Sequence, residues 1–402
     1  MSGTTLDNCT AQISTTKLTA GGIAEDSLNL IYQFVLPEYT QHFCSDMTQN
    51  KSKKQAFSAM TVAPLGDGLI NRTYLVSAPM GQFVLQKINC HVFPAPWTLI
   101  NNSARICDYL NQQVTAGQYQ LSAIKPLATD SGVLALDLGG KGFWRLLSYV
   151  PNSLTLSEVN DAQMALQVGS TFGHFAATLA ELEPSNIAEV IEDFLNLPKR
   201  LHQLQQAAQQ DKHGRLSGCQ SWVDMALNQH DLINELASLE TSLPRRICHN
   251  DTKINNMLFS ATTGEPLAVI DLDTCMPGYL MYDFGDMVRA FCSPVAEDSL
   301  DLERIEARPE LILAAAKGYT YALRDTITEA EQLSLWLGVK VMTLMLASRF
   351  LSDYLQGDEY FAVTRPQHNL QRAVNQFTLY QSQLAQDDAM RAAFSRARPV
   401  RV

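Results

Sequence analysis

Hydrophobic and polar positions follow two different patterns along this chain. Between residues 57 and 150, short apolar runs at 60–64, 73–76 and 82–87 are separated by glycine and proline, which predicts β-strands. After residue 157 the apolar positions recur at helical spacing. We expect helices there at 161–182, 194–210, 222–238, 329–354 and 369–384. The pattern therefore predicts a strand-rich part followed by a mainly helical part.

Further elements suggest where these parts begin and end. Two more strands are expected at 132–137 and 142–150, and the second runs into Pro151, which cannot continue a strand ladder and so predicts a hinge. Helices are expected at 23–43, interrupted by Pro37, and at 97–110. We divide the chain into an N-terminal helical extension at 1–55, a small lobe at 56–150 and a larger helical lobe at 151–402.

Composition narrows the class of protein. A formal net charge of −11 disfavours nucleic acid as a partner, because such binders carry a basic face. The eight cysteines contain no CxxC pair, which is typical of reduced, mostly buried thiols. The apolar run at 333–351 contains Ser334, Lys340 and Arg349, so it predicts a buried helix and no membrane contact. The N-terminal segment has no continuous apolar stretch, and we expect a cytoplasmic protein without a signal peptide.

The chemistry concentrates in one stretch, His249-x-Asp251-x-Lys253-x-x-Asn256, which is followed by Asp271 twenty residues after Asp251. Phosphoryl transfer requires a carboxylate to accept the proton of the attacking hydroxyl, oxygen ligands for Mg²⁺, and cations near the phosphates. Magnesium prefers oxygen ligands such as carboxylates and amides. We assign catalysis to Asp251 and Lys253 and the metal to Asn256 and Asp271.

Each of these assignments has a simpler alternative. Asp251 and Asp271 could cap a helix or turn, and Asp273 could be a turn residue instead of a ligand. His249 is expected to hold the loop structurally, and Lys253 either contacts the γ-phosphate or balances the surrounding carboxylates. The run 282–286, YDFGD, resembles a kinase metal-binding motif but lies too far downstream. We therefore assign it to scaffolding and expect Asp283 to anchor the catalytic loop by hydrogen bonds.

The small lobe offers weaker signals for a nucleotide. A glycine turn between two predicted strands could present backbone amides to phosphates, or it could simply close a hairpin. It lacks the Lys-Ser/Thr ending of a Walker A loop. Lys87 could pair with the α- and β-phosphates or be a surface lysine. The predicted nucleotide-binding residues are Gly66, Gly68, Asn71, Thr73 and Lys87, with Tyr149 and Val150 at the hinge.

The segment HNDTKINNMLF…VIDLDTCMPGYLMYDFGD resembles the aminoglycoside phosphotransferase and choline kinase superfamily, and most closely the N-acetylhexosamine 1-kinases. FVLQKIN at 83–89, FWRLLSYVPNSLT at 143–155 and RFLSDYLQGDEYF at 349–361 are also similar to that subfamily. The resemblance implies an α+β, protein-kinase-like fold with a small antiparallel sheet lobe and a larger helical lobe. It implies ATP and Mg²⁺, a sugar 1-phosphate product, and Asp273, Arg349 and Tyr360 facing the sugar.

The chain departs from this subfamily, in which its N-terminal segment of about 50 residues has no clear counterpart. Leu69 stands where relatives commonly have histidine, and the helix expected at 97–110 has no glutamate to pair with Lys87. Alternatives are therefore a kinase of the same fold for aminoglycosides, choline or homoserine, and a non-catalytic nucleotide-binding pseudokinase. A metal-dependent hydrolase is disfavoured, because it would usually use more histidine ligands. We expect a small-molecule sugar substrate and a monomer or homodimer.

Overall fold

The computed structural model describes residues 23, 25–44, 59–66 and 70–396. The chain divides into two compact units, of which unit 1 contains Met1–Asn89 and Leu127–Tyr149, and unit 2 contains Cys90–Pro126 and Val150–Val402. The chain passes from unit 1 to unit 2 where the sequence predicts a hinge. The segment 90–126, which we had expected in the small lobe, groups with unit 2 because its long helix packs beside the short helical turn that follows Asp271.

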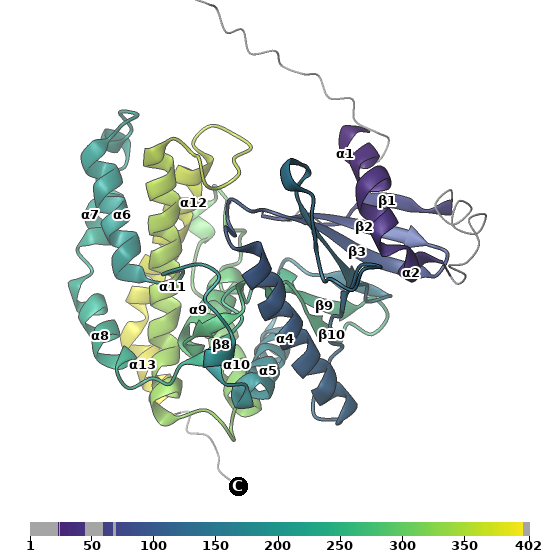
Figure 1. Cartoon of the computed structure of the whole chain (residues 1–402). Coiled ribbons are helices and arrows are strands. Elements are labelled where there is room, and N and C mark those ends of the chain that lie inside the picture. Colours follow the sequence, from purple (N-terminus) through teal and green to yellow (C-terminus); the bar gives the residue numbers. More distant parts are fainter. Residues whose placement is uncertain (1–22, 24, 45–58, 67–69, 397–402) are drawn as a thin grey trace, which may run out of the picture. The chain divides into compact units, whose positions relative to one another are not determined.

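Unit 1 is built on a sheet with the strand order β1-β2-β3-β6-β4, and β5 pairs with β6 (Figure 1). The pairs β1–β2, β2–β3 and β3–β6 are antiparallel, in agreement with the antiparallel sheet lobe that the resemblance implies. The predicted strand at 132–137 is short, because Thr129 and Val133 close a turn before it begins. The strands are β1 Thr61–Pro64, β2 Arg72–Ala78, β3 Gly81–Ile88, β4 Pro126–Leu127, β5 Leu136–Asp137 and β6 Phe143–Ser148.

The helix expected at 23–43 is a series of helical turns. It comprises α1 Glu25–Leu30, a π-turn Ile31–Val35, a 3₁₀ turn Leu36–Tyr39 that contains Pro37, and α2 Thr40–Phe43. Proline removes a backbone donor, which explains why the regular helix gives way there. The buried face of these turns packs on strands β2, β3 and β6 in a single apolar core, so the segment belongs structurally to unit 1.

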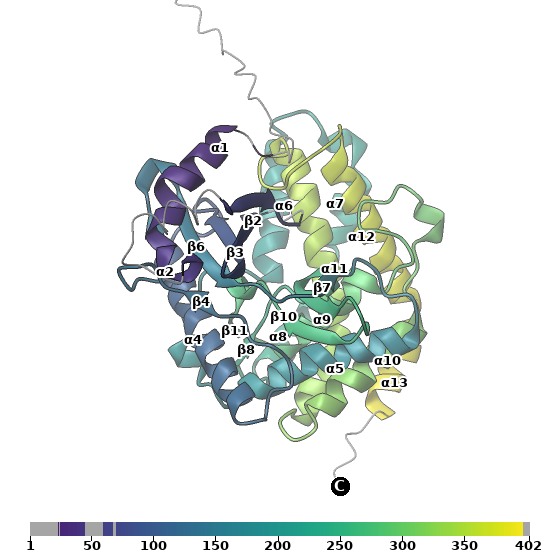
Figure 2. The ribbon, with the colours of Figure 1, turned by 90° about the vertical axis from the view of Figure 1, so that its right-hand side faces the viewer.

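Unit 2 is mainly helical. Helix α10 packs along α5, and α11 packs along α9 and α12 (Figures 1 and 2). The single helix predicted at 222–238 is wrong, because α7 ends at Leu227 and α8 begins at His230. Helices α9 and α10 were not predicted. The helices are α4 Pro96–Thr115, α5 Ala162–Thr178, α6 Leu197–Gln210, α7 Gln220–Leu227, α8 His230–Glu240, α9 Leu280–Phe291, α10 Pro309–Ala322, α11 Glu329–Gln356, α12 His368–Ala385 and α13 Asp387–Arg396.

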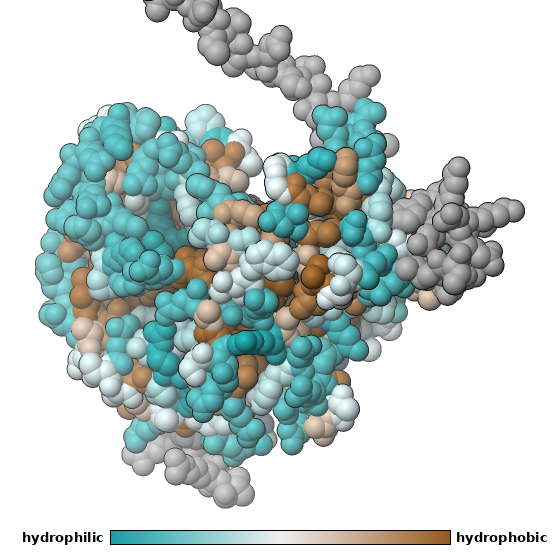
Figure 3. All heavy atoms as spheres, in the orientation of Figure 1, coloured by the Kyte–Doolittle hydropathy of each residue, from teal (hydrophilic) through white to brown (hydrophobic). Residues whose placement is uncertain are grey.

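Helix α11 forms the core of unit 2. It begins at a reciprocal capping box between Thr328 and Glu331 and ends at Gly357, whose positive φ of 107° suits glycine. Its length and apolarity would allow it to cross a membrane, but 83% of its most apolar stretch is buried inside the protein. The predicted buried helix is therefore confirmed. The outer faces of α6 and α7 are hydrophilic (Figure 3), and their apolar residues join the core that they share with α11.

Short strands hold the polar loops of unit 2. Strand β8 Arg246–Cys248 pairs with β11 Met276–Gly278. Strand β9 Met257–Ser260 pairs with β10 Pro266–Val269 on one side and with β7 Ser153–Thr155 on the other. The loop from β8 to β9 carries Asp251, Lys253 and Asn256, and the loop after β10 carries Asp271. The two strand pairs therefore bring the predicted catalytic residues into one region of unit 2.

Candidate active site

Asp283 of α9 anchors the loop between β8 and β9 through two hydrogen bonds. One carboxylate oxygen accepts a hydrogen bond from the His249 backbone N–H at 2.8 Å, and the other accepts from the Asn250 N–H at 2.7 Å. Asn250 has a positive φ of 62°, and its buried side-chain amide donates to the Thr274 carbonyl oxygen. The predicted anchoring role of Asp283 is confirmed.

His249 is a structural residue, as predicted. It is fully buried, its ring lies edge-on to Phe172 and Phe175, and its Nε2 lies 2.9 Å from the Ile270 carbonyl oxygen. A carbonyl oxygen only accepts, so Nε2 carries the proton. The ring thereby ties the catalytic loop to the residue before Asp271.

Asp251 is the ionised carboxylate of the site. Asn256 donates from Nδ2 to its Oδ2 at 2.8 Å, and the Lys253 ammonium lies 3.5 Å from its Oδ1. Burial opposes ionisation, but Lys253 and the hydrogen bond from Asn256 outweigh it, so the pKa of Asp251 lies below its ordinary value. In turn Asp251 raises the pKa of Lys253. With 29% of its side chain exposed, Asp251 remains accessible to a hydroxyl group.

Asn256 and Asp271 lie beside each other because of the β9–β10 pairing. The Ile270 N–H donates to the Asn256 carbonyl oxygen at 2.9 Å, which places Asp271 one residue beyond the pair. Asp271 is exposed and has a positive φ of 60°, a conformation uncommon for a residue with a side chain. One amide and one carboxylate oxygen suit Mg²⁺, which keeps several waters or phosphate oxygens. No cluster of three or more metal-binding His, Cys, Asp or Glu residues occurs in the described part of the chain.

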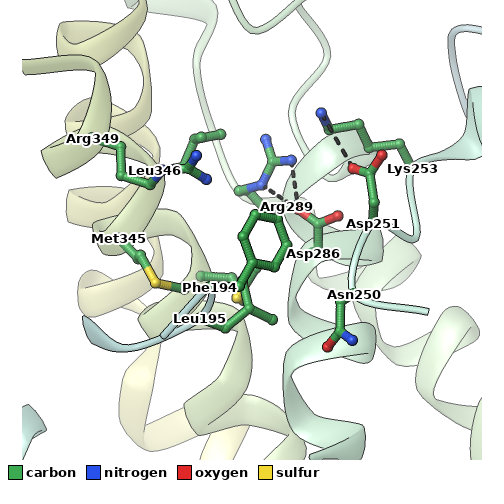
Figure 4. A pocket seen from close by; sticks show the side chains of 11 residues that line it. Phe194, Leu195, Asn250, Asp251, Lys253, Asp286, Arg289, Met345, Leu346 and Arg349 are labelled. Atoms are coloured by element: carbon green, nitrogen blue, oxygen red, sulfur yellow. Dashed lines mark hydrogen bonds and ion pairs between the residues drawn. The ribbon is translucent and has the colours of Figure 1, made fainter. Parts of the chain in front are cut away.

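A small cavity of about 50 Å³ opens beside Asp251. Figure 4 shows Lys253, Arg289 and Arg349 around it together with the carboxylates of Asp251 and Asp286. One wall is apolar and comes from the segment before α6 and from α11. The apolar lining residues are Phe194, Leu195, Met342, Met345 and Leu346.

Arg289 is the buried cation of this cavity, and the sequence analysis missed it. Its guanidinium contacts Asp286 at 2.7 Å and Glu297 at 2.5 Å, with 1% of the side chain exposed. Burial disfavours the charge, but the two carboxylates outweigh burial and raise the pKa of Arg289. Asp286, which the sequence analysis assigned to scaffolding, both holds Arg289 and lines the cavity. In the sequence, the only signal for the Asp286–Arg289 ion pair is their spacing of three residues, which places them on the same face of a helix.

The predicted sugar-facing residues Asp273, Arg349 and Tyr360 do not all lie at this cavity. Arg349 of α11 lines the cavity, and its guanidinium lies over the rings of Phe194, Tyr360 and Phe361 at 5.3–5.6 Å. Tyr360 is half exposed and accepts from Arg349 at 3.3 Å. Asp273, by contrast, is 3% exposed and is not part of this cavity's described lining.

Asp353 positions the loop that carries Tyr360, a role that sequence reasoning also missed. Its two carboxylate oxygens accept from the backbone N–H groups of Tyr360 and Phe361 at 2.8 and 2.9 Å. The side chain is buried one turn after Arg349 on α11. The segment RFLSDYL thus joins a pocket residue to the residue that orders its neighbouring loop.

The predicted nucleotide-binding residues lie mostly in unit 1. Gly66 has a positive φ of 71° at the end of β1, whereas Gly68 lies outside the described residues. The Asn71 side chain accepts from the Asn89 N–H at 2.9 Å and ties the start of β2 to the end of β3. This contact fixes the start of β2 against the end of β3.

The remaining members of this set make local contacts. Thr73 accepts from Gln86 across the β2–β3 pair at 3.1 Å. The Lys87 ammonium lies 5.6 Å from the Trp144 ring centroid. Tyr149 is half-buried, and the Val150 carbonyl accepts from Ser153. Their role with nucleotide stays a prediction.

The protein has an antiparallel sheet unit, a helical unit, and a loop that carries a carboxylate, a lysine and an amide. This combination is typical of phosphotransferases of the protein-kinase-like class. A family model described as the phosphotransferase enzyme family (APH) matches residues 61–324, and the chain belongs to this family. This confirms the predicted superfamily and a phosphotransferase activity.

Solved structures confirm the predicted fold class. A microcompartment-associated aminopropanol kinase matches with a TM-score of 0.55 and 15% identity over 92% of this chain and 99% of that one. The ethanolamine kinase of Plasmodium vivax matches with 0.55 and 13% over 91% and 99%. An aminoglycoside phosphotransferase of Alicyclobacillus acidocaldarius matches with 0.51 and 14% over 85% and 94%. At these identities the likeness concerns the fold.

Proposed function

We propose that this enzyme is a small-molecule kinase that transfers the γ-phosphate of ATP to a sugar hydroxyl, namely the anomeric hydroxyl of an N-acetylhexosamine. The observation that carries the proposal is the charge around the cavity beside Asp251. Two carboxylates, Asp251 and Asp286, face three cations, Lys253, Arg289 and Arg349. A neutral, hydroxyl-rich acceptor suits these groups, because it offers both hydrogen-bond donors and acceptors.

A cationic acceptor suits them less well. The amines of aminoglycosides, ethanolamine and choline are positively charged at neutral pH and would lie near Arg349, whose guanidinium contacts aromatic rings and the Tyr360 hydroxyl. Placing like charges next to each other in a partly buried site costs on the order of several kcal/mol, as it does at protein interfaces. The guanidinium of Arg349, held among aromatic rings, offers a planar fork of donors to sugar oxygens.

In the reaction, Asp251 accepts the proton of the attacking hydroxyl and aligns its oxygen with the γ-phosphorus. The ionised state of Asp251, maintained by Lys253 and Asn256, suits this role. The Lys253 ammonium compensates negative charge beside the acceptor. Asn256 and Asp271 would hold Mg²⁺, which when bound neutralises charge on the phosphates.

The test is a coupled assay of ADP release across a panel of acceptors, with NMR of the product. The panel contains N-acetylglucosamine, N-acetylgalactosamine, the plain hexoses, an aminoglycoside, choline and ethanolamine. We expect the highest kcat/KM for an N-acetylhexosamine and a 1-phosphate product. Preference for an amine would overturn the sugar assignment, and ADP release at background with every acceptor would favour a pseudokinase.

A further inference from the structure

Asp286 has one carboxylate oxygen that no protein group satisfies. The residue lies on α9, and its side chain is 7% exposed. Its Oδ1 accepts from Arg289 twice, from Nη2 at 2.7 Å and from Nε at 3.1 Å. Its Oδ2 is buried and has no hydrogen-bond partner among the described residues. Buried polar atoms are nearly always paired, since an unmade bond costs free energy. The second oxygen therefore points to a missing donor.

The direction of this oxygen places the donor at the active site. Figure 4 shows Oδ2 turned away from Arg289, toward the side of the cavity where Asp251 lies. Arg289 in turn is held by Glu297, so the Asp286 carboxylate cannot rotate without breaking a buried ion pair. The acceptor oxygen is thus preorganised beside the catalytic carboxylate.

The rest of the cavity indicates what the donor is attached to. A volume of about 50 Å³ accommodates a few water-sized groups, at about 10–15 Å³ each, and so a substituent of about four heavy atoms. The wall formed by Phe194, Met345 and Leu346 is apolar and suits a methyl group. An acetamido group has four heavy atoms, an N–H donor and a methyl.

We propose that Asp286 is a specificity-determining residue that accepts a hydrogen bond from the N–H of the acceptor sugar's acetamido group, whose methyl packs against Met345 and Leu346. The proposal rests on the proposed sugar kinase function and assigns its discrimination between sugars to this residue. Arg289 acts as a positioning residue, because it orients Asp286.

The test combines the variant Asp286→Asn with a change of substrate. In the variant, the side-chain oxygen can still accept from Arg289, which leaves the amide NH₂ facing the substrate N–H, donor against donor. We expect kcat/KM for N-acetylglucosamine to fall at least about tenfold more than kcat/KM for 2-deoxyglucose, which has no donor at that carbon. Equal losses for both sugars would show a merely structural role and overturn the inference.

Glu297→Gln is the matched control. Glu297 contacts the same guanidinium at 2.5 Å but lies outside the described cavity lining. We expect this variant to keep the ratio of the two kcat/KM values within about twofold of the unaltered enzyme, since Asp286 remains. A collapse of the ratio equal to that in Asp286→Asn would assign the effect to Arg289 and overturn the proposal.

A second variant tests the methyl position and does not depend on the folding of Asp286→Asn. Met345→Ala shortens the apolar wall and should raise kcat/KM for N-butanoylglucosamine relative to N-acetylglucosamine. An unchanged ratio would overturn the placement of the acyl group. If the unaltered enzyme phosphorylates no sugar, the proposed function fails and this inference with it. Sugar turnover with unchanged discrimination in Asp286→Asn overturns the inference alone.

Discussion

The buried carboxylate of Asp283 sets two physical effects against each other. Two backbone N–H groups of the catalytic loop donate to it, which favours the ionised form. Burial at 2% exposure disfavours that form. Burial dominates and raises the pKa of Asp283 to about 6. Replacing Asp283 by Asn keeps the shape and removes the titration, so the two proteins can be compared as a function of pH.

The raised pKa of Asp283 determines both the sign and the magnitude of its effect on stability as pH changes. Because the folded pKa lies above the unfolded value of about 3.9, the contribution of Asp283 to stability is fully present below that value and is lost as pH rises through about 6. A shift of about two units corresponds to about 3 kcal/mol at 1.36 kcal/mol per unit. At pH 4 the unfolded carboxyl is already about half ionised, so the unfolding free energy of the unaltered protein minus that of Asp283→Asn should fall by about 2.3 kcal/mol between pH 4 and pH 7.

Chemical denaturation at half-unit pH steps measures this difference. Circular dichroism and tryptophan fluorescence must give coincident transitions, because a chain with two units can unfold in stages. Other carboxyl groups, such as Asp251, titrate in both proteins and cancel in the difference. A flat difference would refute the reasoning. A difference that increases with pH would show that the two N–H donors outweigh burial.

Three further outcomes are expected. Asp251→Ala should lower kcat by about 10²–10⁴ with little change in nucleotide affinity, measured by steady-state kinetics and nucleotide titration; near-normal turnover would contradict its role as base. Asp271→Ala should raise the Mg²⁺ concentration needed for nucleotide binding, and an unchanged titration would argue against it as a ligand. In Gly285→Ala the new Cβ would lie 2.3 Å from the Gly338 carbonyl oxygen of α11, so the unfolding free energy should fall by about 1–3 kcal/mol or more, whereas Gly140→Ala, with no atom within 4 Å, should leave it nearly unchanged.

The fold class and the centre of the site could be predicted because their signals are local. Asp251, Lys253 and Asn256 lie within six residues on one loop, so their spacing alone places them together. Asp271 follows a short apolar strand that pairs with the strand after Asn256, and a hairpin brings its two ends into register. The strand and helix periodicities are local signals too, because each depends on which side chains of one segment face the core.

Helix α9 was missed for a different reason. Nearly every residue from Leu280 to Phe291 is buried, including Asp283, Asp286 and Arg289. Its apolar and charged residues do alternate at helical spacing, but the run 282–286 was interpreted as a motif, so this spacing was overlooked. Its close approach to α11 through Gly285 depends on another helix altogether.

The sequence by itself determined which residues could carry out phosphoryl transfer, since those groups act from one loop and the adjoining hairpin. Only the tertiary structure decided what surrounds the acceptor. Asp286 and Arg289 come from α9, Arg349 from α11 and Phe194 from the segment before α6. Side chains so distant along the chain share a cavity because helices pack at particular distances, and spacing along one chain does not encode that packing.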